Sequence, residues 1–391
     1  MSLPTIKFNV NTNGLGLPTA NIQKIPAMVL TGITVAGATN VTTGKSYQIF
    51  SKEEAQNLGI DTTGTNAFAY KEISDFYDGA GKGAELWFML VPQAISMAEM
   101  NDLDNPYVAK LLADAKGKVR IYGTSKKSQV TDVITNGLDA DVDLATVKSQ
   151  ALCVDFANRY KDVRAIISGN SFGGVVADLK DYSTTELNKV AILLANNDGG
   201  KSASIGMLLG RLASIPVQRK ISRVKDGAVA LLNAYFTDGN PVESLDTAWD
   251  AIDNKNYIFL RSFANRSGYY FTGDKTLTLA QDDFNSLARG LVMDKAKILA
   301  YDVLVGELSD EIPVTPAGTI HPAIIKGWQN AIESDINMQM VDKGELSGVK
   351  AFIDENQNVL QTNNIDIVLK LLPVGYSDFI TVNIGFTTTL V

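Results

Sequence analysis

Residues 144–167 read LATVKSQALCVDFANRYKDVRAII, and this stretch decides the fold class. Apolar side chains recur at helical spacing over residues 144–160, and the apolar run at 163–167 follows after two residues. A helix that leads directly into a short buried strand is typical of a βαβ unit. The stretch therefore predicts an α/β domain built on parallel strands.

The same alternation of strands and helices continues on both sides of this pair. Ser51 and Glu54 form a capping-box pattern that predicts a short helix. The further expected strands lie at 27–35, 85–91, 119–122 and 190–194, and the further helices at 67–77, 107–115 and 202–214. Strands separated by helices of this length predict a largely parallel sheet, which we place in an α/β domain at residues 25–275.

The expected helix at 202–214 carries two glycines four residues apart, Gly206 and Gly210. In a membrane this spacing favours helix dimerisation, but the segment is short and contains Arg211. Close packing against another helix of the same domain is the better interpretation.

The last third of the chain has a different pattern. Thr278 and Gln281 suggest a capping box before a long helix that stops near Gly306. Pro322 suits the first position of a second helix, which Gly344 would end. Strands are then expected at 349–353, 365–372 and 379–386, and the last two would form a hairpin across 373–377. These segments predict a smaller α+β domain at residues 276–391.

Both ends of the chain alternate like amphipathic strands. Residues 11–18 are rich in turn formers, so residues 1–24 are expected to be a strand followed by a flexible arm. Ten extended residues reach about 33–36 Å, which is enough to dock on an adjacent subunit. The apolar positions that would meet a neighbouring chain are Ile6, Phe8, Val10, Ile380, Val382, Ile384 and Phe386.

Composition excludes several classes of function. The chain has 391 residues, 35 Lys and Arg against 43 Asp and Glu, and a net charge of −8 without a basic run, so no nucleic-acid partner is expected. The one cysteine, Cys153, sits in an apolar run and is expected to be buried. We expect no signal peptide, because the N-terminus lacks a charged region followed by an apolar region. We also expect no membrane insertion, because the apolar runs are far shorter than the roughly 20 residues of a spanning helix.

One motif suggests catalysis. Residues 169–173 read GNSFG, a G-x-S-x-G pattern after an expected strand, and the only histidine, His321, comes later in the chain. A serine hydrolase that uses Ser171 and His321 is therefore an alternative. The weak helical pattern after Gly174 and the position of His321 directly before Pro322 favour a glycine-rich turn and a helix N-cap instead.

The segments that resemble cofactor-binding and metal-binding motifs lack the residues that these motifs require at fixed positions. The sequences at 44–46 and 200–202 end like a phosphate-binding loop, but Thr39 and Ala195 stand where its first glycine is required. The acidic run at 139–143 has Leu144 at the sixth position of a calcium loop and Gln150 at the twelfth, so it is expected to be an acidic loop before a helix. With one His and one Cys, no usual zinc or iron site is expected, and we predict no cofactor.

Three stretches in a fixed order resemble the tail sheath proteins of contractile phages and contractile injection systems. The first is KVAILLA at 189–195 followed by SIGMLLGRLASIPV at 204–217, and the second is 268–277 followed by a long helix. The third is the block from 313 to the C-terminus, with its PVTPAGTI loop at 313–320. The resemblance covers roughly residue 163 to the end, whereas the first 160 residues match only in general α/β character. The chain is also short for a sheath.

The resemblance implies a structural, non-enzymatic subunit. Such subunits polymerise as stacked six-fold rings around an inner tail tube, meet baseplate and tail terminator proteins, and contract to drive the tube through a target envelope. The protein would lie in a virion tail or injection-system sheath and be assembled in the bacterial cytoplasm. Terminal strands would be exchanged between subunits by β-augmentation, and Lys326, Glu333 and Asp335 would face the tube. Another virion or tail component is a further alternative.

Overall fold

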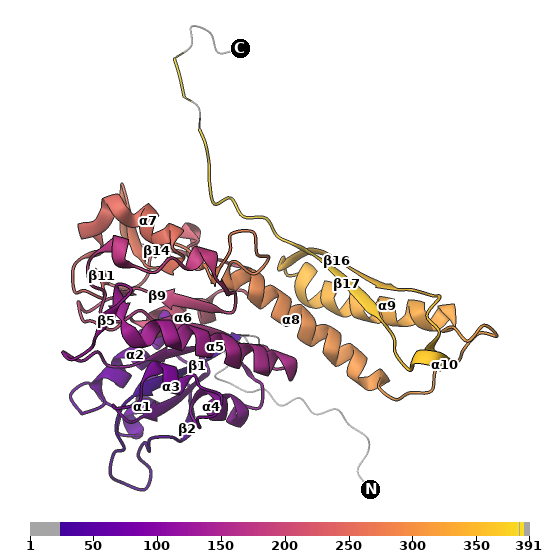
Figure 1. Ribbon diagram of the computed structural model, residues 1–391, viewed down its shortest axis with the longest axis horizontal. Helices are drawn as coiled ribbons and strands as arrows, with labels where there is room; N and C mark the ends of the chain where they lie inside the picture. Colours follow the sequence, from indigo (N-terminus) through magenta and orange to yellow (C-terminus); the bar gives the residue numbers. More distant parts are fainter. Residues whose placement is uncertain (1–23, 383, 387–391) are drawn as a thin grey trace, which may run out of the picture. The chain divides into compact units, whose positions relative to one another are not determined.

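The computed structural model describes residues 24–382 and 384–386, and the chain forms two compact units, Met1–Lys295 and Ala296–Val391 (Figure 1). Unit 1 is a mixed α/β unit, whereas unit 2 is smaller and contains helices and one pair of strands. No helix in the described part of the chain is long and apolar enough to cross a membrane.

Unit 1 is built on a seven-stranded sheet with the strand order β12-β9-β7-β4-β1-β3-β2. Every neighbouring pair is parallel except β2 and β3, which confirms the largely parallel sheet. The strands are β1 (Ile25–Thr31), β2 (Ser46–Ile49), β3 (Leu86–Val91), β4 (Val119–Ser125), β7 (Arg164–Ser168), β9 (Val190–Leu193) and β12 (Tyr257–Ile258).

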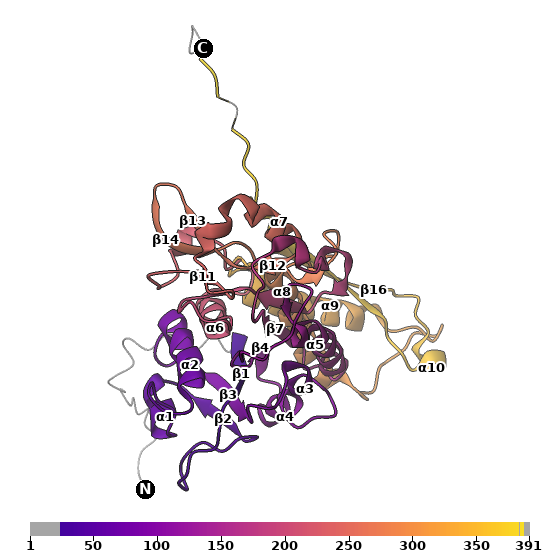
Figure 2. The same cartoon turned by 60° about the vertical axis from the view of Figure 1, so that its left-hand side comes forward.

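Helices cover both faces of this sheet, which is why its central strands are almost entirely buried and rich in apolar residues (Figure 2). One face carries α2 (Ala67–Ala80) and α6 (Ile205–Ser214), with α1 (Lys52–Asn57) beside α2. The other face carries α3 (Met97–Met100), α4 (Val108–Asp114) and α5 (Ala140–Asn158). Because β3 and β4 lie on opposite sides of β1, the unit has the doubly wound arrangement.

The pair α5 and β7 forms as its sequence predicts, with one difference. Asp139 is the N-cap of α5 and accepts a hydrogen bond from the Asp141 amide at 3.1 Å. Asp141 and Asp143 therefore belong to the first turn of the helix rather than to an acidic loop before it. Carboxylates are favourable there because they face the positive end of the helix dipole. Cys153 is buried on the inner face of the helix, as predicted.

The two glycines of α6 allow it to lie directly on α2. A Cβ atom at Gly206 would lie 1.9 Å from the carbonyl oxygen of Glu72, and one at Gly210 would lie 2.4 Å from that of Phe76. No side chain fits at such distances, so the backbones of the two helices are in contact. The predicted close packing of this helix is confirmed.

Short elements complete unit 1. Four small antiparallel ladders join β10 to β11, β13 to β14, β15 to β8 and β5 to β6. These elements are β5 (Ile134–Thr135), β6 (Leu138–Asp139), β8 (Glu186–Leu187), β10 (Ala195–Asn196), β11 (Tyr235–Phe236), α7 (Trp249–Asn254), β13 (Leu260–Phe263), β14 (Arg266–Phe271) and β15 (Leu277–Thr278).

The long helix α8 (Leu287–Leu304) exists as predicted but begins later. The expected capping box is wrong, because Thr278 lies in β15 and its hydroxyl donates to Asp282. Two residues cap the helix instead: the Ser286 hydroxyl accepts from the Arg289 amide at 3.3 Å, and the Asp274 carboxylate accepts from the Ala288 amide at 3.0 Å. Ser286 is a local capping signal, whereas the contact from Asp274, in a distant loop, leaves no pattern near the start of the helix.

The first half of α8 is fixed to the sheet of unit 1 by a buried ion pair. Arg164 at the start of β7 donates from Nε and Nη2 to the two carboxylate oxygens of Asp294, at 2.8 and 3.2 Å. Its third nitrogen, Nη1, donates to the carbonyl of Asn188 at 3.0 Å. A bidentate ion pair of this kind holds this part of the helix in one orientation.

Unit 2 contains α9 (Pro322–Ile336), a π-helical turn (Asn337–Val341), β16 (Leu346–Ile353), α10 (Val359–Thr362) and β17 (Ile367–Pro373). Helix α9 starts as predicted, with Pro322 in its first turn and His321 as N-cap. A small core of Ile320, Ile325, Trp328 and Ile353 joins the helix to β16. Strands β16 and β17 pair antiparallel.

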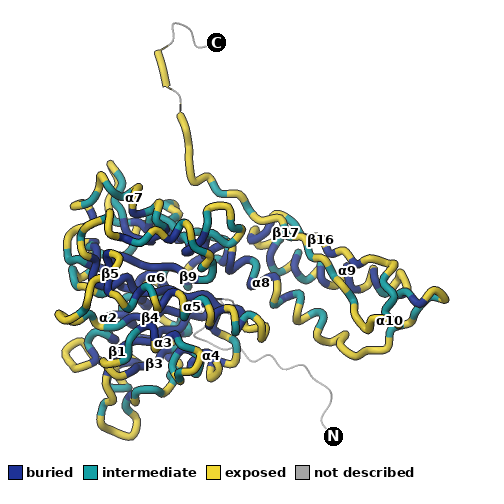
Figure 3. The backbone as a smooth tube through the Cα atoms, in the orientation of Figure 1, coloured by how far each residue is buried: buried dark blue, intermediate teal, exposed yellow. Residues whose placement is uncertain are grey.

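The expected hairpin between residues 365–372 and 379–386 does not form. Strand β17 pairs with β16, and residues 374–382 and 384–386 form neither helix nor strand. Figure 3 shows this terminal segment as mostly exposed chain. Strand β16 lies beside β17 and buries Ala351 and Ile353 against α9, so β17 has a partner strand without the terminal segment.

Candidate assembly site

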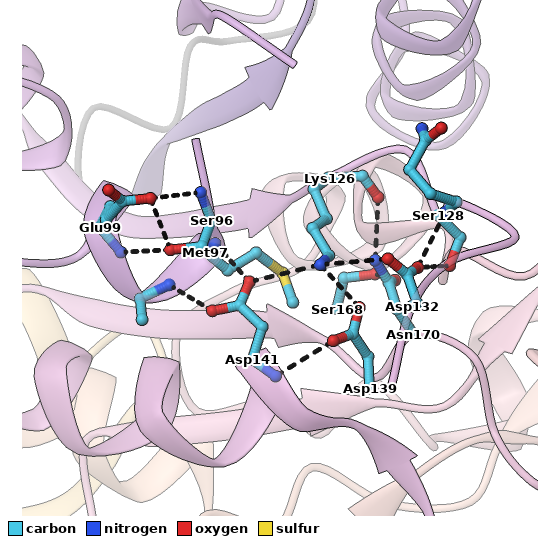
Figure 4. A network of polar contacts seen from close by, with 12 residues as sticks. Ser96, Met97, Glu99, Lys126, Ser128, Asp132, Asp139, Asp141, Ser168 and Asn170 are labelled. Carbon is cyan, nitrogen blue, oxygen red and sulfur yellow. Dashed lines mark hydrogen bonds and ion pairs between the residues drawn. The ribbon is translucent and has the colours of Figure 1, made fainter. Parts of the chain in front are cut away.

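Two parts of the chain are candidate functional sites, one for catalysis or ligand binding and one for assembly with other subunits. The first is the carboxyl edge of the parallel sheet, where doubly wound domains bind their ligands. Lys126 follows β4 there, and Asn170 and Ser171 follow β7 (Figure 4).

The chain's own polar groups occupy this edge. The Lys126 ammonium lies 2.8 Å from Asp139, 3.5 Å from Asp132 and 3.8 Å from Asp141. Burial disfavours the charge on Lys126, but the three aspartates outweigh it and raise its pKa. Asp141 also accepts hydrogen bonds from the amides of Met97 and Ala98, at 2.5 and 2.9 Å. The network joins β4, α3 and α5, and one ammonium faces three carboxylates in it.

Ser171 is a member of this network and not of a nucleophile elbow. Its hydroxyl lies 2.5 Å from that of Ser128 and 3.5 Å from the carboxylate of Asp132. The elbow of α/β-hydrolases requires a helix directly after the serine. The chain here continues through bends to a short 3₁₀ turn, Val176–Asp178.

His321 has the structural role that its position before Pro322 suggests. It is the N-cap of α9, and its Nδ1 accepts a hydrogen bond from the Ala323 amide at 3.3 Å. Ser171 belongs to unit 1 and His321 to unit 2. The described geometry of both residues therefore supports the glycine-rich turn and the N-cap.

The second place is the two-stranded sheet of unit 2. A sheet of two strands is only marginally stable by itself, and an edge strand carries backbone groups that can bind a further strand. Its outer face exposes Phe352 and Val368, which lie directly opposite each other, and Leu372, with the exposed pair Lys350 and Lys370 between them. Exposed apolar side chains beside a strand edge are typical of a surface that another chain covers.

The segment from Phe379 onward supplies a strand-like sequence whose described apolar side chains are exposed. Phe379 is 95% exposed and Ile384 is 96% exposed, so these side chains contact almost nothing in their own chain. Ile380, Val382 and Phe386 are also exposed. The C-terminal interface candidates are thus free to meet another surface, whereas Ile6, Phe8 and Val10 lie outside the described residues.

The three residues expected to face a tube differ in their surroundings. Lys326 is exposed and donates to Gln329 at 3.0 Å, and Asp335 accepts from Gln339 at 3.1 Å. Glu333 is turned toward β16, where it accepts from the Ala351 amide at 2.8 Å and pairs with Lys350 at 3.1 Å. Partial burial raises the pKa of Glu333, but these two partners outweigh it and hold the pKa below its usual value. Sequence spacing gave no sign of this contact.

Family models match nearly the whole chain. The DUF2586 N-terminal domain matches residues 3–275, and the DUF2586 C-terminal domain matches residues 283–391. The chain belongs to the DUF2586 family. No curated protein sequence matches it.

Solved structures show the fold of this DUF2586 protein at full length. A chain of the contracted helical sheath of the anti-feeding prophage (AFP) matches with a TM-score of 0.65 at 12% identity, over 100% of both chains. A chain of the AFP baseplate matches with 0.64 at 12% identity, over 99% of this chain and 100% of that one. A chain of the contracted PVC sheath complex, from an extracellular contractile injection system, matches with 0.57 at 13% identity, over 99% and 98%. The fold that the sequence resemblance predicted is confirmed.

Proposed function

We propose that this DUF2586 protein is a structural subunit of a contractile sheath. The observation that carries the proposal is that unit 2 contains both a strand edge that can bind a further strand and a sequence that could supply one. The sheet has two strands, and the same chain has an alternating apolar segment at 379–386 whose described apolar side chains are exposed. The full-length likeness to chains of contracted sheaths supports the same assignment.

The joint between subunits would be an exchanged strand. Backbone hydrogen bonds give such a joint its affinity, and alternating side chains give it its register. Burying Ile380, Val382, Ile384 and Phe386 contributes about 1.5–3 kcal/mol for each side chain. Ordering the backbone costs about 1–2 kcal/mol per residue, so a single joint is weak and a lattice of many joints is needed.

This arrangement explains how a sheath can contract without a nucleotide. A strand joined through an extended segment keeps its partner while the compact units move between two lattices. The free energy for the movement then comes from contacts formed in the contracted lattice. The proposed partners are further copies in stacked six-fold rings, an inner tail tube, and baseplate and tail terminator proteins. The site of action is a tail or injection-system sheath assembled in the bacterial cytoplasm.

Removal of the terminal strands tests the proposal. We expect that deleting residues 380–391, or residues 1–10, prevents assembly of the purified chain, because each deletion removes one strand of the joint. Circular dichroism and thermal unfolding should show an intact fold, since the exposed C-terminal segment contributes little to the core. Assembly measured by sedimentation that is unchanged in both deletions would overturn the proposal.

A second role is favoured by one observation. The chain also matches a chain of the AFP baseplate over its full length. A tail component that forms a single ring at the baseplate would share the fold and the strand exchange but would not grow into a tube. Electron microscopy of the assembled protein distinguishes rings that stop from rings that stack.

A further inference from the structure

Helix α9 packs against the inner face of the two-stranded sheet, and one of its side chains, Glu333, reaches the edge of β16. Its Glu333 carboxylate accepts from the Ala351 amide at 2.8 Å and lies 3.1 Å from the Lys350 ammonium. An amide that donates to α9 points away from β17. Ala351 and its partner Leu369 are therefore a pair that is not hydrogen-bonded across the ladder.

The alternation of an antiparallel ladder then identifies the groups on both edges. The backbone groups of Val349, Ala351 and Ile353 point to the edge of β16, along which α9 packs. Those of Ile367, Leu369 and Leu371 point to the opposite edge, on β17.

The side chains on β17 also indicate a missing neighbour. Ile367, Leu369 and Leu371 face the core side of the sheet, yet each is only half-buried. Of their counterparts on β16, Ala351 and Ile353 are 2% and 3% exposed, and Val349 is half-buried. A third strand beside β17 would extend the apolar inner face and complete the burial of the three β17 side chains.

We propose that β17 is the edge that receives a strand from a second copy of this chain, and that Glu333 closes the edge of β16 against it. This inference rests on the proposed strand exchange and adds which edge of the sheet receives the strand. A strand could enter beside β16 only after the Glu333 carboxylate left the Ala351 amide. Hydrogen bonds to an ionised carboxylate are among the strongest in proteins, and charges placed on a sheet edge are a known protection against unwanted pairing.

Disulfide trapping between two differently labelled chains tests the direction. Receiver chains carry Phe352→Cys on β16 or Val368→Cys on β17, which are matched because these residues are exposed and lie opposite each other. The native Cys153 is buried and stays in place. Donor chains, mixed with a receiver before assembly, carry one cysteine each at Phe8, Asn9, Ile380 or Thr381, which covers both terminal strands and both faces of each.

We expect at least ten-fold more trapped product with Val368→Cys than with Phe352→Cys. Adding Glu333→Ala to the receiver should raise the Phe352→Cys product to a similar level, because it opens the β16 edge. Glu333→Gln retains an acceptor oxygen for the Ala351 amide and should change the ratio far less. Thermal unfolding of the Glu333 variants confirms that unit 2 is folded.

Two other outcomes have separate meanings. Equal trapping on the two receivers, or more on Phe352→Cys, would overturn the assigned direction while the strand exchange stands. No intermolecular product with either receiver from any donor would overturn the strand exchange itself, and this inference with it.

Discussion

At the scale of single residues, the absence of a side chain at two glycines of α6 allows this helix to contact the backbone of α2. Gly206 and Gly210 bring α6 onto the backbone of α2, and the Gly206 amide donates to the buried carboxylate of Glu72 at 2.7 Å. Glu72 thereby caps α6 from a neighbouring helix. The helix pair is thus held by close packing and by one buried hydrogen bond at the same point.

Gly206→Ala should destabilise unit 1 by at least about 1–3 kcal/mol, the usual effect of overpacking. The added methyl would lie 1.9 Å from the Glu72 carbonyl oxygen, so the helices must separate. Gly327→Ala is the matched control, because Gly327 lies in α9 with no atom within 4 Å of the added methyl. The control should be neutral or stabilising by up to about 1 kcal/mol. Urea unfolding measures both, and equal stability of the two variants would contradict the packing argument.

The ionisation of Glu72 gives a prediction for pH. Burial raises its pKa to about 8, and the attraction of Lys71 only partly offsets this. The folded chain therefore binds a proton that the unfolded chain releases, and stability falls as the pH rises from about 4.5 to about 8. Glu72→Gln should lose this pH dependence, and its stability relative to the wild type should increase with pH over that window. Parallel pH profiles of urea unfolding for the two proteins would refute the assignment.

At the scale of elements, the sequence predicted what is encoded locally. The helix α5 and strand β7 follow from apolar spacing, and the start of α9 follows from Pro322. The start of α8 was placed too early because Thr278 and Gln281 match a capping box, whereas Ser286 and the distant Asp274 cap the helix. The terminal hairpin was wrong, because β17 pairs with β16 and the described residues of the terminal segment form no strand. The contact between Glu333 and Ala351 was invisible in the sequence, since it joins a helix to a strand 18 residues away.

The exposed face of α9 is the element to test for a tube contact. Lys326 points to solvent, whereas Glu333 supports β16 and should not be mutated for this purpose. Lys326→Glu should weaken co-sedimentation of the assembled sheath with its tube at least several-fold and leave the fold intact. Lys343→Glu makes the same charge change at another exposed position of unit 2 and serves as control. Equal losses, or no loss in either variant, would remove Lys326 from the tube-facing surface.

At the scale of the whole molecule, the chain has the features of a lattice subunit. Its two compact units are each folded around a core, and its C-terminal segment exposes five large apolar side chains. The carboxyl edge of the parallel sheet, where related architectures bind ligands, is occupied by the network around Lys126. On the proposed function, the free energy of assembly would come from contacts of unit 2 and of the C-terminal segment with other copies.

Electron microscopy of the expressed full-length chain tests the central claim most directly. The account predicts hollow tubes of stacked six-fold rings that grow longer with protein concentration, because each added ring is joined through exchanged strands. A monodisperse monomer at high concentration, unaffected by deletion of residues 380–391, would contradict it.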